Sequence, residues 1–307
     1  MAPVMQFFIL DVFAEEPLAG NQLAVFLSMG SLKTEQMQKL AREMNYSEVT
    51  FIESLDSKNG YPVRIFTPTR EIPFAGHPVL GTAYLIQKEI IRDNVERVVL
   101  DLKCGPITVD LSYQNNKVDI LWMRHPKLSL GQKLDARQVS STLGLDISAI
   151  DSRFPVQEAS TGFPFIFIPL NTLDSLRGIS MTRDRYFELI EKTDAKALLA
   201  FAPAAYSPQN HMNVRVFAEY YGAVEDPATG SANGALAGYL SHYKYFGSEH
   251  VDVRVEQGTE IGRPSLLFLQ THRENMNIDI SVGGRVQVFA KGTVEAEVGE
   301  MATTSRG

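Results

Sequence analysis

Two segments of this chain place polar side chains at the start of a helix built from small residues. Residues 75–86, AGHPVLGTAYLI, align without a gap on residues 229–240, TGSANGALAGYL. The alignment pairs Gly76 with Gly230 and His77 with Ser231. A helix start offers free backbone N–H groups and the positive end of the helix dipole, which together bind anions. A repeat at this wide spacing predicts two similar halves, with one cleft between them that receives both helix starts.

Two carboxylates have positions that suit proton transfer. Asp226 stands just outside the second helix start, where we expect the helix dipole to lower the pKa of Asp226 by favouring its charged form. Glu48 precedes the apolar residues Val49 and Phe51 at the entrance of a strand. Partial burial there would raise the pKa of Glu48 towards that of a useful general base. The simpler interpretations are a turn residue for Asp226 and a solvated side chain for Glu48.

Three further side chains also have both a functional and a simpler interpretation. The repeat fixes His77 at the functional end of a helix, which favours a role in chemistry over a purely structural one. Asn21 follows Gly20 in a turn, where its amide contacts a ligand or, more simply, closes an Asx-turn. A nucleophilic role for Ser231 would need a histidine from the other half, and the sequence has no GxSxG motif.

The elements that position these residues follow from hydrophobic periodicity and turn residues. We predict amphipathic or buried helices at 32–44, 75–86, 134–143, 182–192 and 232–240. We predict strands at 5–13, 23–26, 49–52, 62–67, several between 98 and 123, and at 155–158, 163–169, 195–200, 212–218 and in series from 251 to 298. Each half is therefore strand-rich around a central helix, which is an α+β design.

The order of these elements also predicts the domain organisation. We place the N-terminal half at residues 1–125 and the C-terminal half at residues 126–291, with a boundary region at 124–130. The last strand is expected to return to the first half within residues 292–307. A chain of 307 residues with 44% hydrophobic composition is long enough for two cores.

Composition excludes several classes of function. The net charge of −7 argues against nucleic acid or an anionic membrane as a partner. The single cysteine, Cys104, rules out an intramolecular disulfide framework and a Cys-based metal cluster, and we expect it to be buried. The first sixteen residues lack the basic region of a signal peptide, and no apolar run reaches the ~20 residues of a membrane span. We therefore expect a cytoplasmic protein.

Six ordered motifs resemble one family. They are DVFAEEPLAGNQLAVF, NYSEVTFI, RIFTPTREIPFAGHPVLGTAYLI, VEDPATGSANGALAGYL, EQGTEIGRPS and SVGGRVQV, and they span nearly the entire chain. Together they resemble the family of the phenazine-biosynthesis protein PhzF, which shares the diaminopimelate epimerase fold. The resemblance implies two pseudo-symmetric halves, each a barrel-like mixed sheet around a central helix, and a site that uses no cofactor or metal.

The resemblance also implies roles for individual residues. Glu48 matches the family's proton-shuttling base, and His77, Asp226 and Ser231 match the other catalytic positions. We predict that Asn21, Ser47, Gly76 and Gly230 complete the site as substrate-binding residues. Gln22 is a departure, since many relatives have proline there.

The function implied is isomerisation of a small carboxylate-bearing molecule by proton transfer. The related epimerases use two opposed cysteines, whereas the helix starts here carry His77 and Ser231, so racemisation by two thiols is not expected. The alternative is a non-catalytic small-molecule binding protein that keeps the fold. Close relatives are commonly homodimers, and the resemblance implies the same here.

Overall fold

The structure is a computed structural model that describes residues 5–28, 32–55, 58–274 and 277–294. Its helices and strands form two halves, which we call the first half and the second half. The first half contains β1 (Met5–Val12), β2 (Asn21–Leu27), α1 (Thr34–Met44), β3 (Glu48–Ile52), β4 (Tyr61–Phe66), β5 (Glu71–Ile72), α2 (Gly76–Leu85), a π-helix (Ile86–Ile91), β6 (Arg97–Leu102), β7 (Gly105–Gln114), β8 (Lys117–His125) and β18 (Val286–Val294). The second half contains β9 (Ser129–Lys133), α3 (Ala136–Thr142), β10 (Gln157–Ser160), β11 (Pro164–Pro169), α4 (Leu173–Arg177), α5 (Arg183–Glu191), β12 (Ala197–Ala202), β13 (Met212–Ala218), β14 (Ala223–Asp226), α6 (Gly230–His242), β15 (Asp252–Gln257), β16 (Ser265–Glu274) and β17 (Asn277–Gly284).

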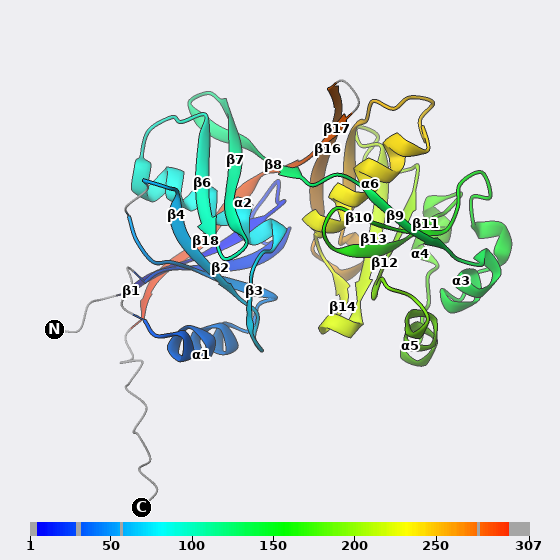
Figure 1. The fold of residues 1–307 in the computed structure, drawn as a ribbon, viewed down its shortest axis with the longest axis horizontal. Coiled ribbons are helices and arrows are strands. Elements are labelled where there is room, and N and C mark those ends of the chain that lie inside the picture. Colours follow the sequence, from blue (N-terminus) through cyan, green and yellow to red (C-terminus); the bar gives the residue numbers. More distant parts are fainter. Residues whose placement is uncertain (1–4, 29–31, 56–57, 275–276, 295–307) are drawn as a thin grey trace, which may run out of the picture.

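Two helices, α2 and α6, lie at the centres of the halves (Figure 1). Every residue of α2 is buried except Tyr84, and every residue of α6 is buried except Ser231 and His242. A helix without a polar face must be covered on all sides, here by the surrounding strands. Small residues let those strands approach closely, since a Cβ atom on Gly81 of α2 would lie 2.6 Å from Cδ2 of Leu23 in β2.

The strands of the two halves pair in the same order. In the first half, the pairs β1–β2, β2–β3, β3–β4, β4–β6, β6–β7 and β7–β8 are antiparallel, parallel, antiparallel, parallel, antiparallel and antiparallel. The pairs β10–β11, β11–β12, β12–β13, β13–β15, β15–β16 and β16–β17 repeat that series in the second half. The central helices occupy equivalent places, α2 between β4 and β6 and α6 between β13 and β15. The expected α+β fold of two pseudo-symmetric halves is therefore confirmed.

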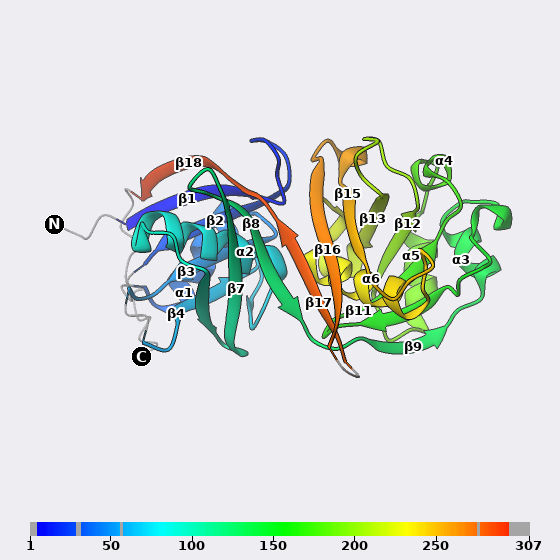
Figure 2. The same ribbon diagram turned by 90° about the horizontal axis from the view of Figure 1, so that it is seen from above.

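The two halves are joined by strands that run between them (Figure 2). β8 and β17 pair antiparallel with each other. After β8 the chain enters the second half, where β9 pairs with β10, and after β17 it returns to the first half, where β18 pairs with β1. This pairing of β18 begins at Val286, before the expected return over 292–307, of which residues 295–307 lie outside the described residues. The domain boundary at residue 125 stays a prediction.

All five predicted helices are present with small shifts at their ends. The helices predicted at 32–44, 134–143, 182–192 and 232–240 correspond to α1, α3, α5 and α6. The helix predicted at 75–86 is α2, which the π-helix extends, and α4 was not predicted from the sequence. Within the described ranges, no helix is long and apolar enough to cross a membrane.

Candidate functional site

The starts of α2 and α6 touch each other where the two halves meet. A Cβ atom on Gly76 would lie 3.5 Å from Cα of Gly230 and 3.5 Å from the backbone nitrogen of Ser231. The N-cap residues, Ala75 and Thr229, make no side-chain hydrogen bond to the first turn of their helices. The first N–H groups of both helices have no partner within their own helix. Two uncapped helix starts in contact form an arrangement suited to binding an anion.

His77 and Glu48 bring an imidazole and a carboxylate together beside these helix starts. His77 Nε2, near the start of α2, lies 3.6 Å from Oε2 of Glu48, the first residue of β3. His77 is buried, and its ring forms a hydrogen bond with the backbone of Gln22. Nε2 has no hydrogen-bond partner among the described residues, so the bond to Gln22 is made by Nδ1. In the neutral ring, Nδ1 carries the proton and Nε2 presents its lone pair to Glu48.

Burial sets the protonation of this pair. Loss of solvation lowers the pKa of His77 to about 4, although the nearby Asp226 charge and the Gln22 hydrogen bond oppose this. The imidazole is therefore neutral near pH 7. Burial also raises the pKa of Glu48 above its usual value, against a hydrogen bond from Ser47 that favours the charged form. The Glu48 side chain keeps 19% of its surface exposed, so a ligand can reach it.

Asp226, at the end of β14, is held at both carboxylate oxygens. Nδ2 of Asn21 donates to Oδ1 at 3.1 Å, and the Thr229 hydroxyl donates to Oδ2. The expectation that the helix dipole lowers the pKa of Asp226 is wrong, because loss of solvation outweighs every stabilising contact and raises the pKa to about 6. The charge of Glu48 acts in the same upward direction. Asp226 therefore changes its charge closer to neutral pH than an ordinary aspartate.

Asn21 links the two halves through all of its amide group. Its Nδ2 also donates to the backbone oxygen of Ala228 at 2.9 Å, and its Oδ1 lies 3.4 Å from Ser47 Oγ, whose one hydrogen is available either to this oxygen or to Glu48. Ser47 and Asn21 belong to the first half, whereas Asp226 and Ala228 belong to the second. The structure thus places Asn21 between Asp226 and the loop that precedes Glu48. Its amide fixes these groups relative to one another.

Two residues of this site were missed in the sequence reasoning. The side chain of Gln257 at the end of β15 holds both Thr229 and the backbone of Asp226. Thr229 and Gln257 stand in the family motifs at 224–240 and 256–265, and that position is the only signal that could have found them. Ser231, by contrast, lies at the start of α6 as predicted and is partly exposed.

Other parts of the chain contribute less to a site. Cys104, which we expected to be buried, is exposed because it lies in the turn between β6 and β7. Over the residues that the structure describes, no three His, Cys, Asp or Glu side chains are grouped to hold a metal ion.

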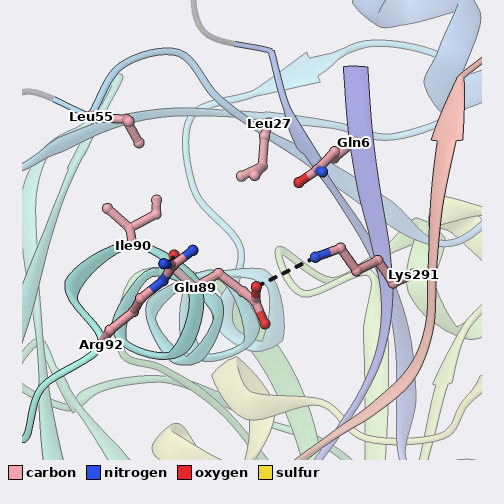
Figure 3. Close-up of a pocket in the computed structure, with 7 residues that line it drawn as sticks. All are labelled: Gln6, Leu27, Leu55, Glu89, Ile90, Arg92 and Lys291. Atoms are coloured by element: carbon pink, nitrogen blue, oxygen red, sulfur yellow. Dashed lines mark hydrogen bonds and ion pairs between the residues drawn. The ribbon is translucent and has the colours of Figure 1, made fainter. Parts of the chain in front are cut away.

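The first half has a hollow on its surface (Figure 3). Its volume is about 390 Å³, and its walls come from β1, β2, the π-helix and β18 with their neighbouring loops. The lining residues are Gln6, Leu27, Leu55, Glu89, Ile90, Arg92 and Lys291. Lys291 Nζ lies 3.6 Å from Oε2 of Glu89 and 4.9 Å from the centre of the Phe8 ring, so its charge is already engaged. None of the predicted site residues lines this hollow.

Known proteins are similar to this chain over almost its full length. The phenazine biosynthesis-like protein family (PhzC-PhzF) matches residues 10–292. The trans-2,3-dihydro-3-hydroxyanthranilate isomerases of Pseudomonas aeruginosa and Pseudomonas fluorescens are 34% and 37% identical, and each match covers 94% of this chain and 98% of the relative. A PhzF-family phenazine biosynthesis protein of Bacillus anthracis has the same fold, with a TM-score of 0.86 at 23% identity over 95% of this chain and 99% of that one. The resemblance inferred from the motifs is confirmed, and the chain belongs to the PhzF family of phenazine biosynthesis-like proteins.

Proposed function

We propose that this protein is an isomerase that moves a proton on a small carboxylate-bearing molecule by general acid–base catalysis, without a cofactor. The observation that carries the proposal is the contact between Glu48 and His77 beside Asp226, at the junction of two uncapped helix starts. Three titratable groups thus lie beside a place suited to an anion. The names of the isomerase relatives support the same reaction class.

Glu48 is the proposed base. In its ionised form it accepts a proton from a carbon atom of the substrate, and the electron pair of the broken C–H bond passes into an enolate-like system. The proton returns to a different carbon of that system, so no atom is gained or lost. Glu48 holds the proton between the two steps, because its pKa is raised while that of the facing His77 is lowered, and Asp226 lies close enough to act on both charges.

The helix starts are the proposed site for the substrate carboxylate. Backbone N–H groups at Gly76, His77, Gly230 and Ser231 lie near one another because Gly76 and Gly230 are in contact. The negative charge that develops when the carbon proton leaves is stabilised by the same donors and by both helix dipoles. Asn21 and Ser47 complete the proposed set by holding Asp226 and the Glu48 loop in place.

The direct test is exchange of carbon-bound hydrogen in D₂O, followed by proton NMR. The panel should contain trans-2,3-dihydro-3-hydroxyanthranilate, which the Pseudomonas relatives are named for, and small cyclic and acyclic amino and hydroxy acids. We expect deuterium to enter one of these compounds with the wild type, at a rate reduced ~10²-fold or more in Glu48→Gln. The matched control is Glu43→Gln, since Glu43 is exposed on α1 away from the site.

Each outcome has a clear meaning. Equal exchange by the wild type and Glu48→Gln would remove Glu48 as the base. Saturable binding of a panel compound without exchange or turnover would instead support a non-catalytic binding protein. We also propose that the chain forms a homodimer, which is what the resemblance of its motifs implies, and a monomer in sedimentation at micromolar concentration would contradict this.

A further inference from the structure

Gln257 is fully buried, and its amide group makes every hydrogen bond that it can. Nε2 donates to the backbone oxygen of Asp226 at 2.7 Å and to Oγ1 of Thr229 at 3.0 Å. Oε1 accepts from the backbone nitrogen of Thr229 at 3.2 Å and from Nδ2 of Asn233 at 2.9 Å. A backbone carbonyl can only accept and a backbone N–H can only donate, so these partners allow one orientation of the amide.

This orientation decides where the Thr229 proton goes. The Thr229 hydroxyl accepts a bond from Gln257, so its single hydrogen is free to be given to another acceptor. That acceptor is Oδ2 of Asp226, while Oδ1 of the same carboxylate receives a bond from Asn21. A directed chain of donors therefore runs from Gln257 through Thr229 to Asp226. Both ends of the carboxylate accept, which is the pattern of an ionised group.

The backbone keeps Gln257 against this loop. Gly258 follows Gln257 with φ of +79°, a conformation that favours glycine. A Cβ atom there would lie 2.6 Å from the backbone oxygen of Pro227, the residue after Asp226. The close approach brings the end of β15 directly under the Asp226 turn. The donors are thus held by packing as well as by hydrogen bonds.

Two titratable groups from the first half also act on Asp226. His77 in α2 favours the charged carboxylate when it is protonated, and Glu48 in β3 disfavours it. Burial dominates and raises the pKa of Asp226 to about 6, while the bonds from Thr229 and Asn21 hold the pKa below the value that burial alone would impose. The donor chain therefore acts against the rise of the pKa.

We propose that Gln257 is a positioning residue for Asp226, which it controls through Thr229. By fixing the direction of the Thr229 hydroxyl, Gln257 keeps a donor on Oδ2 and so favours the charged, singly oriented carboxylate. Its role in turnover rests on the proposed isomerase function. Its effect on the ionisation of Asp226 does not, because that effect exists without substrate.

The test follows the titration of Asp226 by NMR, with ¹³C at the aspartate carboxyl carbons, in the full-length protein. The Asp226 signal is the one that disappears in Asp226→Asn. We expect Thr229→Val, which removes the hydroxyl with little change in shape, to raise the midpoint by about one unit. Thr229→Ser keeps the hydroxyl and should leave the midpoint within a few tenths of the wild-type value.

Gln257→Met is the variant that tests the chain itself. We expect it to raise the Asp226 midpoint in the wild-type background and to cause no further rise when Val already replaces Thr229, since the effect passes through the hydroxyl. Equal rises in both backgrounds would overturn the proposal, as would a Thr229→Val midpoint equal to that of the wild type. If Gln257→Met does not fold, the comparison of Val with Ser at Thr229 still decides whether the hydroxyl acts on Asp226, and Gln257→Leu, which removes the donors without adding a charge, takes the place of Met.

The kinetic readout separates this inference from the proposed function. In an active enzyme, the limb of the pH profile that belongs to Asp226 should move upwards in Thr229→Val, whereas a merely structural loss would lower the rate equally at every pH. Shifted NMR midpoints without any exchange activity would leave the inference standing and count against the isomerase. Exchange activity with unshifted midpoints would support the isomerase and overturn the inference on Gln257.

Discussion

Nε2 of His77 faces Oε2 of Glu48 at 3.6 Å, while the proton of the imidazole is held on the other side of the ring by the backbone of Gln22. When Glu48 is ionised, both facing atoms carry lone pairs and attract each other only if a proton lies between them. Burial favours Glu48 as the place of that proton, because burial lowers the pKa of His77 and raises the pKa of Glu48. The pair therefore binds one proton, which Glu48 carries and donates towards Nε2 of His77.

The first prediction concerns the pH dependence of exchange. A base must be ionised to act, so the raised pKa of Glu48 should place the acidic limb of kcat/KM above the ordinary glutamate value of 4.5. In His77→Gln, an amide N–H can donate to Glu48 and favour its charged form, so we expect this limb to move to lower pH while kcat falls. Profiles measured from about pH 4 to pH 8 check both shifts. A limb that stays in place in His77→Gln would contradict the pairing.

The second prediction concerns the junction of the two helix starts. In Gly76→Ala, the new methyl group would lie 3.5 Å from the Ser231 nitrogen and cover its N–H group. We expect KM to rise about tenfold or more, since roughly one charge-assisted hydrogen bond is lost. Alanine suits a helix better than glycine, so the free energy of unfolding should stay the same or increase by up to ~1 kcal/mol. A loss of stability that accompanies the loss of affinity would point to packing instead of anion binding.

The third prediction concerns stability and Asp226. Its pKa is about 6 in the folded protein and about 3.9 in the unfolded chain, so the folded state binds the proton more tightly. The stabilisation is complete below about pH 4 and is lost as the pH rises through about 6. Asp226→Asn does not suffer this loss and should gain about 2 kcal/mol relative to the wild type between about pH 4 and pH 7.

Urea unfolding at several pH values measures that difference. His77 has the opposite dependence, because its folded pKa of about 4 lies below the value of about 6.5 in the unfolded chain. Its stabilisation is present above about pH 6.5 and is lost towards about pH 4. The wild-type curve alone therefore mixes two opposed contributions, and only the difference between variant and wild type isolates Asp226. A difference that does not change with pH would exclude a raised pKa for Asp226.

The fourth prediction concerns an ion pair that joins the halves. Nη2 of Arg263 in the second half lies 2.7 Å from Oδ1 of the buried Asp11 in β1, and the same guanidinium donates to the backbone oxygens of Ala19 and Gly20. Arg263→Met leaves Asp11 buried without its partner, so we expect a loss of about 3 kcal/mol in the free energy of unfolding. The control is Arg97→Met, whose pair with Asp110 is exposed and should contribute at most about 0.5 kcal/mol. Equal losses in the two variants would show that Arg263 does not hold the halves together.

The sequence by itself showed the internal repeat and predicted the division of the chain into two similar halves. The gapless match of residues 75–86 with 229–240 predicted two similar halves, and the strand-rich pattern of each half predicted a sheet around one central helix. The identical series of strand pairs in the two halves confirms it. The motifs also identified the family, which the matched relatives confirm.

Only the tertiary structure decided how the site residues affect one another. The helix dipole near Asp226 can be read from the sequence, but the burial that outweighs it cannot, and neither can the effects of Glu48, His77 and Asn21, which are distant in the chain. The exposed position of Cys104 likewise depends on how a turn lies on the surface. The role of Gln257 follows from the end of β15 lying against the Asp226 turn. Protonation and hydrogen bonding depend on solvation and on contacts across the chain, and local sequence patterns carry neither.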